Sequence, residues 1–104
     1  MSNAAREAIF PQISEKRWRE AIVRFALFHR WDVYWTWRSD NSPSGFPDLV
    51  LVRGDRCLFV ELKSEQGKLT KNQQHWAEVL SRCGSVEYFK WRPSDEDLVW
   101  ELLK

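Results

Sequence analysis

The sequence predicts an α/β fold with seven elements in the order helix, strand, strand, strand, helix, strand, helix. Two segments of the 104-residue chain repeat apolar residues at helical spacing. The segments around them are short and rich in aromatic and β-branched residues, and Gly54-Asp55 separates two of these by a tight turn. The length predicts one domain spanning residues 1–104.

The first helix is expected from about Ser14 to His29, with the Ser14 hydroxyl as its N-cap. One apolar face is predicted from the spacing of Trp18, Ala21, Ile22, Phe25, Phe28 and His29. Glu15 lies about 70° from the centre of that face, and Glu20 about 150° from it. Glu15 can therefore reach a site beside the sheet or simply face the positive end of the helix, whereas Glu20 points to solvent.

Three strands are expected in the middle of the chain, over residues 32–37, 47–52 and 56–63. The first contains Trp35 and Trp37, either of which could stack on a base. A turn-rich stretch follows it over residues 39–45. The second and third strands are apolar on both faces, so we expect them in the centre of the sheet, covered on each side.

The two-residue turn fixes the pairing of the second and third strands. Asp48 comes to lie opposite Glu61, with Cβ atoms roughly 4.5–5.5 Å apart, and Lys63 shares their face. Facing carboxylates destabilise a sheet unless a divalent cation binds between them. The alternative is a pair of exposed, solvated acids at strand ends, but the lysine and the apolar neighbours favour a site.

A second helix is expected over residues 70–82, with Thr70 as its cap and Gly84 just beyond its end. Its apolar stripe, formed by Leu69, Trp76 and Leu80, is interrupted by Gln73. Gln73 thus faces the sheet, either within a site or as an ordinary hydrogen-bonded amide. A strand over residues 85–91 and a helix over residues 95–104 complete the predicted fold.

Composition narrows the classes of function. No apolar run is long enough to span a bilayer, no signal peptide opens the chain, and two cysteines predict a reducing cytoplasm rather than a disulfide scaffold. We interpret Met1–Ala4 as a tag remnant without function. The net charge is only +1, but residues 1–31 and 62–92 each hold six basic and three acidic side chains, so basic patches can exist.

The motifs around the paired acids resemble those of a known family. Gly45-Phe46-Pro47-Asp48-Leu49 followed by Glu61-Leu62-Lys63 is similar to the signature of PD-(D/E)XK nucleases. The wider pattern resembles the VRR-NUC branch over roughly residues 14–103: an early Glu15, SGFPDLVLV, LFVELKSEQGKLT, Gln73 with Trp76, and Trp91-Arg92-Pro93. Lys71-Asn72 stands where this family is expected to have Pro-Glu, and every core motif residue is present.

The resemblance implies a restriction-endonuclease-like fold: an αβββαβ core with a mixed central sheet flanked by helices, here with an additional C-terminal helix. It also implies Mg²⁺- or Mn²⁺-dependent hydrolysis of phosphodiester bonds. Asp48, Glu61, the main-chain carbonyl of Leu62 and Glu15 would be the metal ligands. Lys63 would position or help deprotonate the attacking water.

Further implications concern the substrate and its contacts. Gln73 would orient Lys63 or a water molecule at the metal, and Arg17, Arg38, Lys68 and Lys71 are candidates for contacts with DNA phosphates. Stand-alone members of this size, of phage or bacterial type, resemble enzymes that cut branched or Holliday-junction-like DNA, often as homodimers. The alternatives are a non-catalytic nucleic-acid-binding or assembly module, a nuclease without structure selectivity, a sequence-specific restriction-type enzyme, and a nuclease directed at RNA.

Overall fold

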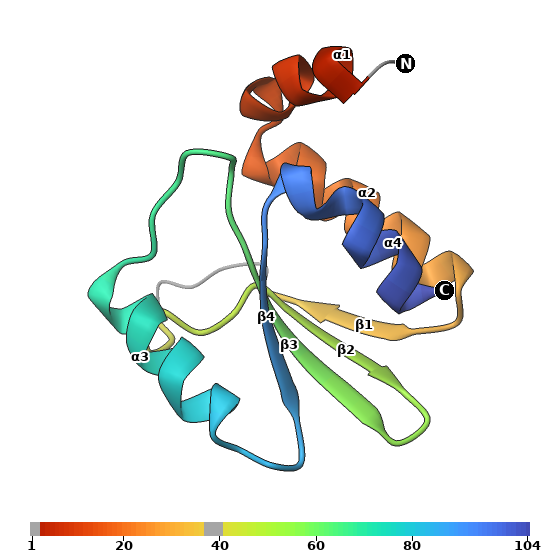
Figure 1. Cartoon of the computed structure of the whole chain (residues 1–104). Coiled ribbons are helices and arrows are strands. Elements are labelled where there is room, and N and C mark those ends of the chain that lie inside the picture. Colours follow the sequence, from red (N-terminus) through yellow and green to blue (C-terminus); the bar gives the residue numbers. More distant parts are fainter. Residues whose placement is uncertain (1–2, 37–40) are drawn as a thin grey trace.

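The computed structural model describes residues 3–36 and 41–104, and it has the predicted mixed α/β architecture. Its helices are α1 (Asn3–Ile9), α2 (Glu15–Phe28), α3 (Lys71–Ser81) and α4 (Glu96–Leu103), with 3-10 turns η1 (Phe10–Gln12) and η2 (Pro93–Asp95). Its strands are β1 (Asp32–Trp35), β2 (Leu49–Arg53), β3 (Arg56–Leu62) and β4 (Glu87–Trp91). The restriction-endonuclease-like core and the C-terminal helix are therefore confirmed (Figure 1).

The four strands form one mixed sheet in the order β1-β2-β3-β4. β1, β2 and β3 pair antiparallel, whereas β4 lies parallel to β3. The predicted hairpin register is confirmed, because Arg53 pairs with Arg56 and Leu49 with Val60. Gly54 has a φ of 62° in the turn, a conformation that glycine adopts without a Cβ penalty.

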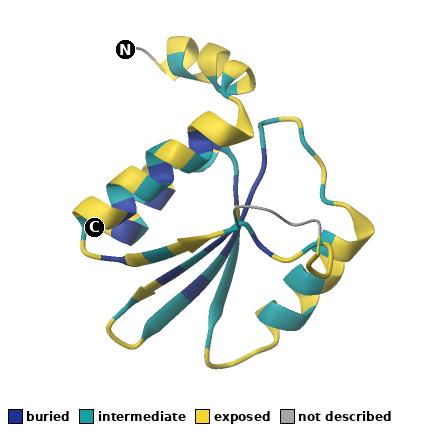
Figure 2. Ribbon diagram, turned by 180° about the vertical axis from the view of Figure 1, so that it is seen from behind, coloured by how far each residue is buried: buried dark blue, intermediate teal, exposed yellow. Residues whose placement is uncertain are grey.

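The hydrophobic core lies between the sheet and the helices α2 and α4, which cover the same face (Figures 1 and 2). The sheet contributes Leu49, Leu51, Leu58, Val60 and Leu62, all at most 1% exposed. From α2 come Trp18, Ile22 and Ala26. Trp18 and Ile22 lie on the predicted apolar face, but Ala26 is not part of that prediction, and Phe28, which is, lies 81% exposed at the last turn of the helix. The Ser14 cap is confirmed as well, since its hydroxyl accepts a hydrogen bond from the Arg17 amide at 3.2 Å.

The opposite face of the sheet is only partly covered, which corrects the expectation that both faces are buried. Val50, Cys57 and Phe59 are half-buried there, and Val52 is exposed. The single helix on this side, α3, has no fully buried residue and packs mainly against β4. One helix of 11 residues cannot cover four strands, so part of this face stays open.

The N-terminal helix α1 is absent from the sequence prediction and includes two of the residues interpreted as a tag remnant. It buries no residue, so its sequence has no apolar periodicity from which the helix could be predicted. Arg6 fixes it to the start of α4 by ion pairs with Glu96 at 2.6 Å and Asp97 at 2.8 Å. No helix in the described part of the chain is long and apolar enough to cross a membrane.

Replacing Ile22 by alanine is expected to lower the free energy of unfolding by about 2–5 kcal/mol, because the fully buried side chain leaves a cavity. Leu27→Ala, on the same helix but at a position 54% exposed, is expected to change it by less than about 0.5 kcal/mol. Urea denaturation of both variants measures the difference. Equal losses would contradict the assignment of the core face.

Candidate active site

Two carboxyl groups face each other on the open side of the sheet. Asp48 directly precedes β2 and Glu61 lies near the end of β3, at positions that continue the Leu49–Val60 pairing. Asp48 Oδ2 accepts a hydrogen bond from the Leu62 amide at 2.8 Å. Glu61 is only 2% exposed, so the alternative of two solvated strand ends is wrong.

The surroundings of this pair disfavour two negative charges. Burial raises the pKa of Glu61 from 4.5 to about 8, and the neighbouring Asp48 charge adds to the shift. Burial also raises the pKa of Asp48, against the Leu62 amide and the positive charge of Lys63, which lower it. Glu61 Oε2 is buried and has no hydrogen-bond partner among the described residues. Such an acceptor is costly unless a cation or a proton satisfies it.

Lys63 completes the predicted trio. It follows the end of β3, is 8% exposed, and lies close enough to lower the pKa of both carboxyl groups. Its amide donates to the Trp91 carbonyl at 3.1 Å, and the same carbonyl accepts from Trp18 Nε1 on α2, also at 3.1 Å. Through these two hydrogen bonds the Trp91 carbonyl connects the end of β3 to β4 and α2.

The turn that follows Lys63 is held by Arg92. Arg92 Nη1 donates to the carbonyls of Ser64 at 2.7 Å, Glu65 at 3.2 Å and Gly67 at 2.6 Å. This turn, over residues 64–67, lies beside the Lys63 side chain, because a Cβ at Gly67 would lie 3.4 Å from Lys63 Cδ. Arg92, recognised only as part of a sequence motif, therefore orders the segment beside Lys63.

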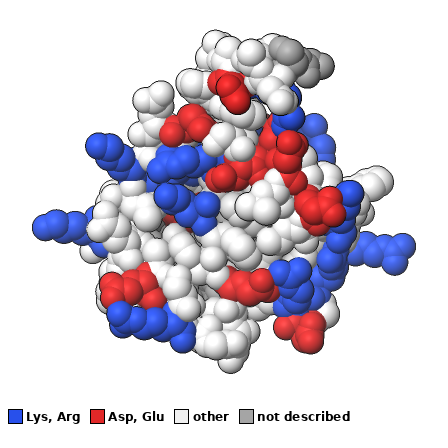
Figure 3. All heavy atoms as spheres, viewed as in Figure 1, with Lys and Arg blue, Asp and Glu red and all other residues white. Residues whose placement is uncertain are grey.

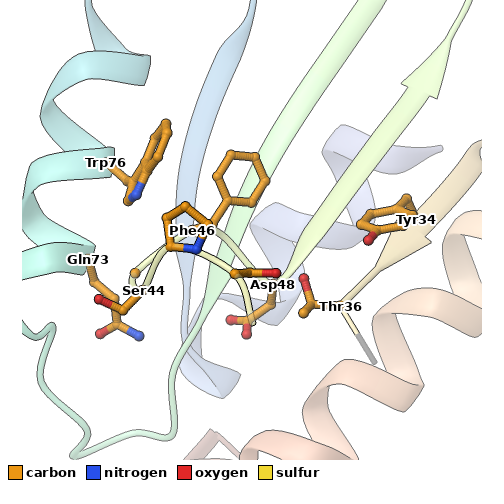
Figure 4. A pocket seen from close by; sticks show the side chains of 10 residues that line it. Tyr34, Thr36, Ser44, Phe46, Asp48, Gln73 and Trp76 are labelled. Atoms are coloured by element: carbon orange, nitrogen blue, oxygen red, sulfur yellow. The ribbon is translucent and has the colours of Figure 1, made fainter. Parts of the chain in front are cut away.

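A hollow of about 540 Å³ opens beside Asp48 on the same side of the sheet (Figure 4). It is lined by Tyr34, Thr36, Ser42, Pro43, Ser44, Gly45, Phe46, Asp48, Gln73 and Trp76. The Thr36 amide donates to the Asp48 carbonyl at 3.2 Å, which brings the end of β1 next to the acid. Gln73 and Trp76 come from α3 on the other wall.

Gln73 faces this hollow, as its place in the apolar stripe predicts. It also has a structural task, because Gln73 Oε1 accepts from the Thr70 amide at 2.9 Å while the Gln73 amide donates to Thr70 Oγ1 at 3.1 Å. This reciprocal capping box confirms Thr70 as the helix cap. The orienting role of Gln73 toward Lys63 stays a prediction.

Glu15 and Glu20, the two acidic residues of α2, point in different directions, as their angles around the helix predict. Glu15 is the first residue of α2, and its charge reaches Glu61 and raises the pKa of that carboxyl group. Glu20 instead lines a second hollow between α2 and β1, together with Lys16, Arg24 and Trp35. Trp35 thus lies on the α2 side of the sheet, and Trp37 falls outside the described residues.

The candidate phosphate contacts that the structure describes come from three segments of the chain. Arg17 lies on α2, Lys68 in the loop before α3, and Lys71 at the start of α3; all three are exposed. Arg38 lies outside the described residues. On the face of the molecule that Figure 3 shows, basic and acidic side chains lie interspersed.

Three residues near the site are not among those that the sequence singled out. Arg19 lowers the pKa of Asp48 by its charge, and its position four residues after Glu15 is the signal that could have revealed it. Tyr88 pairs with Phe59 across β4 and β3, and burial with the charges of Glu61 and Asp48 raises its pKa to about 12. Tyr34 projects from β1 into the hollow beside Asp48.

The side chains around Asp48 and Glu61 offer oxygen donors for a divalent cation. No three Asp, Glu, His or Cys side chains within residues 3–36 and 41–104 gather into a complete metal site. Mg²⁺, however, is commonly held by one or two carboxylates, with water and substrate phosphates as its other ligands. Two facing carboxyl groups and an unpaired buried Glu61 oxygen fit such a cation.

Comparisons with known proteins agree with this geometry. A family model described as VRR-NUC domain matches residues 8–89, most of the chain and both paired acids. Searches of curated proteins and of solved structures gave no match.

The metal-free protein is expected to lose stability as pH rises from about 4.5 to about 8. Over this range folded Glu61 keeps a proton that the unfolded chain, with a carboxyl pKa near 4.5, has released, so folding binds protons. Below pH 4.5 the Glu61 carboxyl group is protonated in both the folded and the unfolded chain. Above pH 8 it is ionised in both, and the folded protein bears the full repulsion between Glu61 and Asp48. Thermal unfolding in EDTA from pH 5 to 8 measures the slope, and Glu61→Gln should flatten it. An unchanged slope in this variant would contradict the buried-carboxyl account.

Arg92→Lys is expected to loosen the turn over residues 64–67, because an ammonium group cannot span the three carbonyls that the guanidinium binds. Amide exchange at Gly67, whose N–H donates to the Ser64 carbonyl at 3.2 Å, should accelerate roughly ten- to a hundredfold. Arg82→Lys, at an exposed ion pair on α3, is the matched control. Equal exchange rates in the two variants would show that Arg92 does not hold the turn.

Proposed function

We propose that this chain, which belongs to the VRR-NUC domain family, is a Mg²⁺- or Mn²⁺-dependent endonuclease that cuts branched or Holliday-junction-like DNA. Membership of the family gives a nuclease-type function and DNA as the substrate. The observation that carries the metal dependence is the buried pair Asp48–Glu61, with one Glu61 oxygen left unpaired among the described residues. A pair of this kind is poorly explained by folding alone.

In the proposed mechanism Asp48 and Glu61 would hold the cation, with the Leu62 carbonyl and Glu15 as further candidate ligands. A cation bound there would polarise the scissile phosphate and lower the pKa of a water molecule. Lys63 holds positive charge beside both carboxyl groups, where it would position the attacking water and offset charge on the transition state. Gln73 would orient Lys63 or the attacking water from the α3 wall.

Phosphate contacts outside the centre are assigned to Arg17, Lys68 and Lys71, together with Arg38. Arg19 joins them, because its charge reaches Asp48. Such contacts carry no base readout and give binding that weakens with salt. Selection of a four-way junction by shape would need two active sites at a fixed separation, which a twofold-symmetric homodimer supplies.

Alanine at Asp48, Glu61 or Lys63 is expected to abolish cleavage while the far-ultraviolet circular dichroism stays that of the wild type. Glu15→Ala should weaken cleavage, because its carboxylate acts near Glu61, whereas Glu20→Ala should not. The assay compares linear, flapped and four-way-junction DNA in Mg²⁺, Mn²⁺ or EDTA.

The outcomes separate the alternatives. Metal-dependent cutting of the junction that Lys63→Ala loses supports the proposal in full. Equal cutting of all DNA keeps the nuclease and removes its structure selectivity. If the folded wild type binds DNA without cutting it, the chain is a non-catalytic binding module. If the alanine variants lose their fold, Asp48, Glu61 and Lys63 have a structural role instead of a catalytic one.

A further inference from the structure

The hollow beside Asp48 has features that cleavage chemistry alone does not require. It starts at the carboxyl centre and extends between β1 and α3, over the part of the sheet that α3 leaves uncovered (Figure 4). Its volume of about 540 Å³ falls within the range of roughly 300–1,000 Å³ typical of small-molecule sites. A ligand of about the size of one nucleoside therefore fits.

Its walls are aromatic on two sides. On the α3 side, Phe46 packs edge-on against Trp76, with ring centroids 5.0 Å apart, and against Phe59 at 5.7 Å. On the β1 side, Tyr34 is 62% exposed and makes no ring contact with any described residue. A large ring left in solvent beside a hollow is a typical stacking surface for a flat ligand.

The polar groups of the hollow select the chemistry of that ligand. Thr36, Ser42 and Gln73 can donate or accept hydrogen bonds, as the edge of a nucleobase requires. Among the described residues that line the hollow, only Asp48 is charged, and its carboxyl group would repel a phosphate. These described groups therefore favour a neutral, flat and polar-edged ligand.

One wall is fixed before any ligand arrives. Gly45 has a φ of 90°, and a Cβ there would lie 2.4 Å from the Asn72 carbonyl carbon in α3. Asn72 Nδ2 also donates to Ser44 Oγ. The segment from Ser44 to Phe46 is thus pinned to the first turn of α3, which reduces the entropy cost of binding.

We propose that this hollow receives an unpaired nucleobase of the DNA, adjacent to the phosphate that a cation at Asp48 and Glu61 would contact. The proposal rests on the proposed function and defines its substrate class: DNA with an unpaired nucleotide at the cleavage position. A base in an intact duplex is stacked and paired, and extracting it costs free energy that an already unpaired base does not require. Junction centres, flaps and bulges offer such a base.

The test compares two duplexes of equal length, one fully paired and one with a single unpaired 2-aminopurine in its centre. Dissociation constants are measured by fluorescence anisotropy in Ca²⁺, a hard cation that takes oxygen ligands. The wild type is expected to bind the duplex with the unpaired base about tenfold more tightly, with a change in 2-aminopurine emission on entry into the hollow.

Tyr34→Ala should remove this preference, whereas Tyr34→Phe keeps the ring and should retain it. Phe28→Ala, which removes a ring 81% exposed at the end of α2, is the matched control and should retain it as well. Circular dichroism confirms that each variant is folded.

Cleavage of both duplexes in Mg²⁺ separates the two proposals. Metal-dependent cutting together with a preference that depends on Tyr34 supports both. Cutting without the preference, or with a preference that Tyr34→Ala retains, overturns the nucleobase site and leaves the nuclease. A preference that depends on Tyr34 without any cutting supports the nucleobase site and overturns the nuclease.

Discussion

The repulsion between two carboxyl groups on an apolar sheet is the constraint that governs the rest of this structure. Asp48 and Glu61 lie on facing strands, and Glu61 is almost fully buried. Burial and mutual repulsion make their joint ionisation unfavourable, as the raised pKa values of both groups indicate. The Leu62 amide and the Lys63 charge relieve only part of that cost. The remainder is the driving force with which the site would take a cation.

Several elements serve to hold this unfavourable arrangement in place. The Gly54 turn fixes the register that opposes the two acids. The Trp91 carbonyl binds both Lys63 and Trp18, so the end of β3 is fastened to the core. Arg92 orders the next turn through three carbonyls. The strain of the carboxyl pair is thus supported by a well-packed face on the opposite side of the sheet.

The unequal covering of the two faces gives the site its access. α2 and α4 cover one face of the sheet and enclose the core with it, while α3 packs mainly against β4 on the other face and forms a wall (Figure 2). The space between that wall and β1 is the hollow beside Asp48. Chemistry at the carboxyl centre and recognition in the hollow would therefore share one open surface, built on strands whose backs are rigidly packed.

The sequence by itself determined the order of helices and strands from α2 to α4, the hairpin register, the two helix caps and the grouping of Asp48, Glu61 and Lys63. These follow from local rules, since turn length sets register and strand alternation sets the face. Only the tertiary structure decided how far α3 covers the sheet, that Arg92 braces the Lys63 turn, and that Tyr34 and Arg19 border the site. It also added α1, which Arg6 connects to α4 by ion pairs. Such features depend on distances between segments remote in the chain, and no local periodicity encodes those distances.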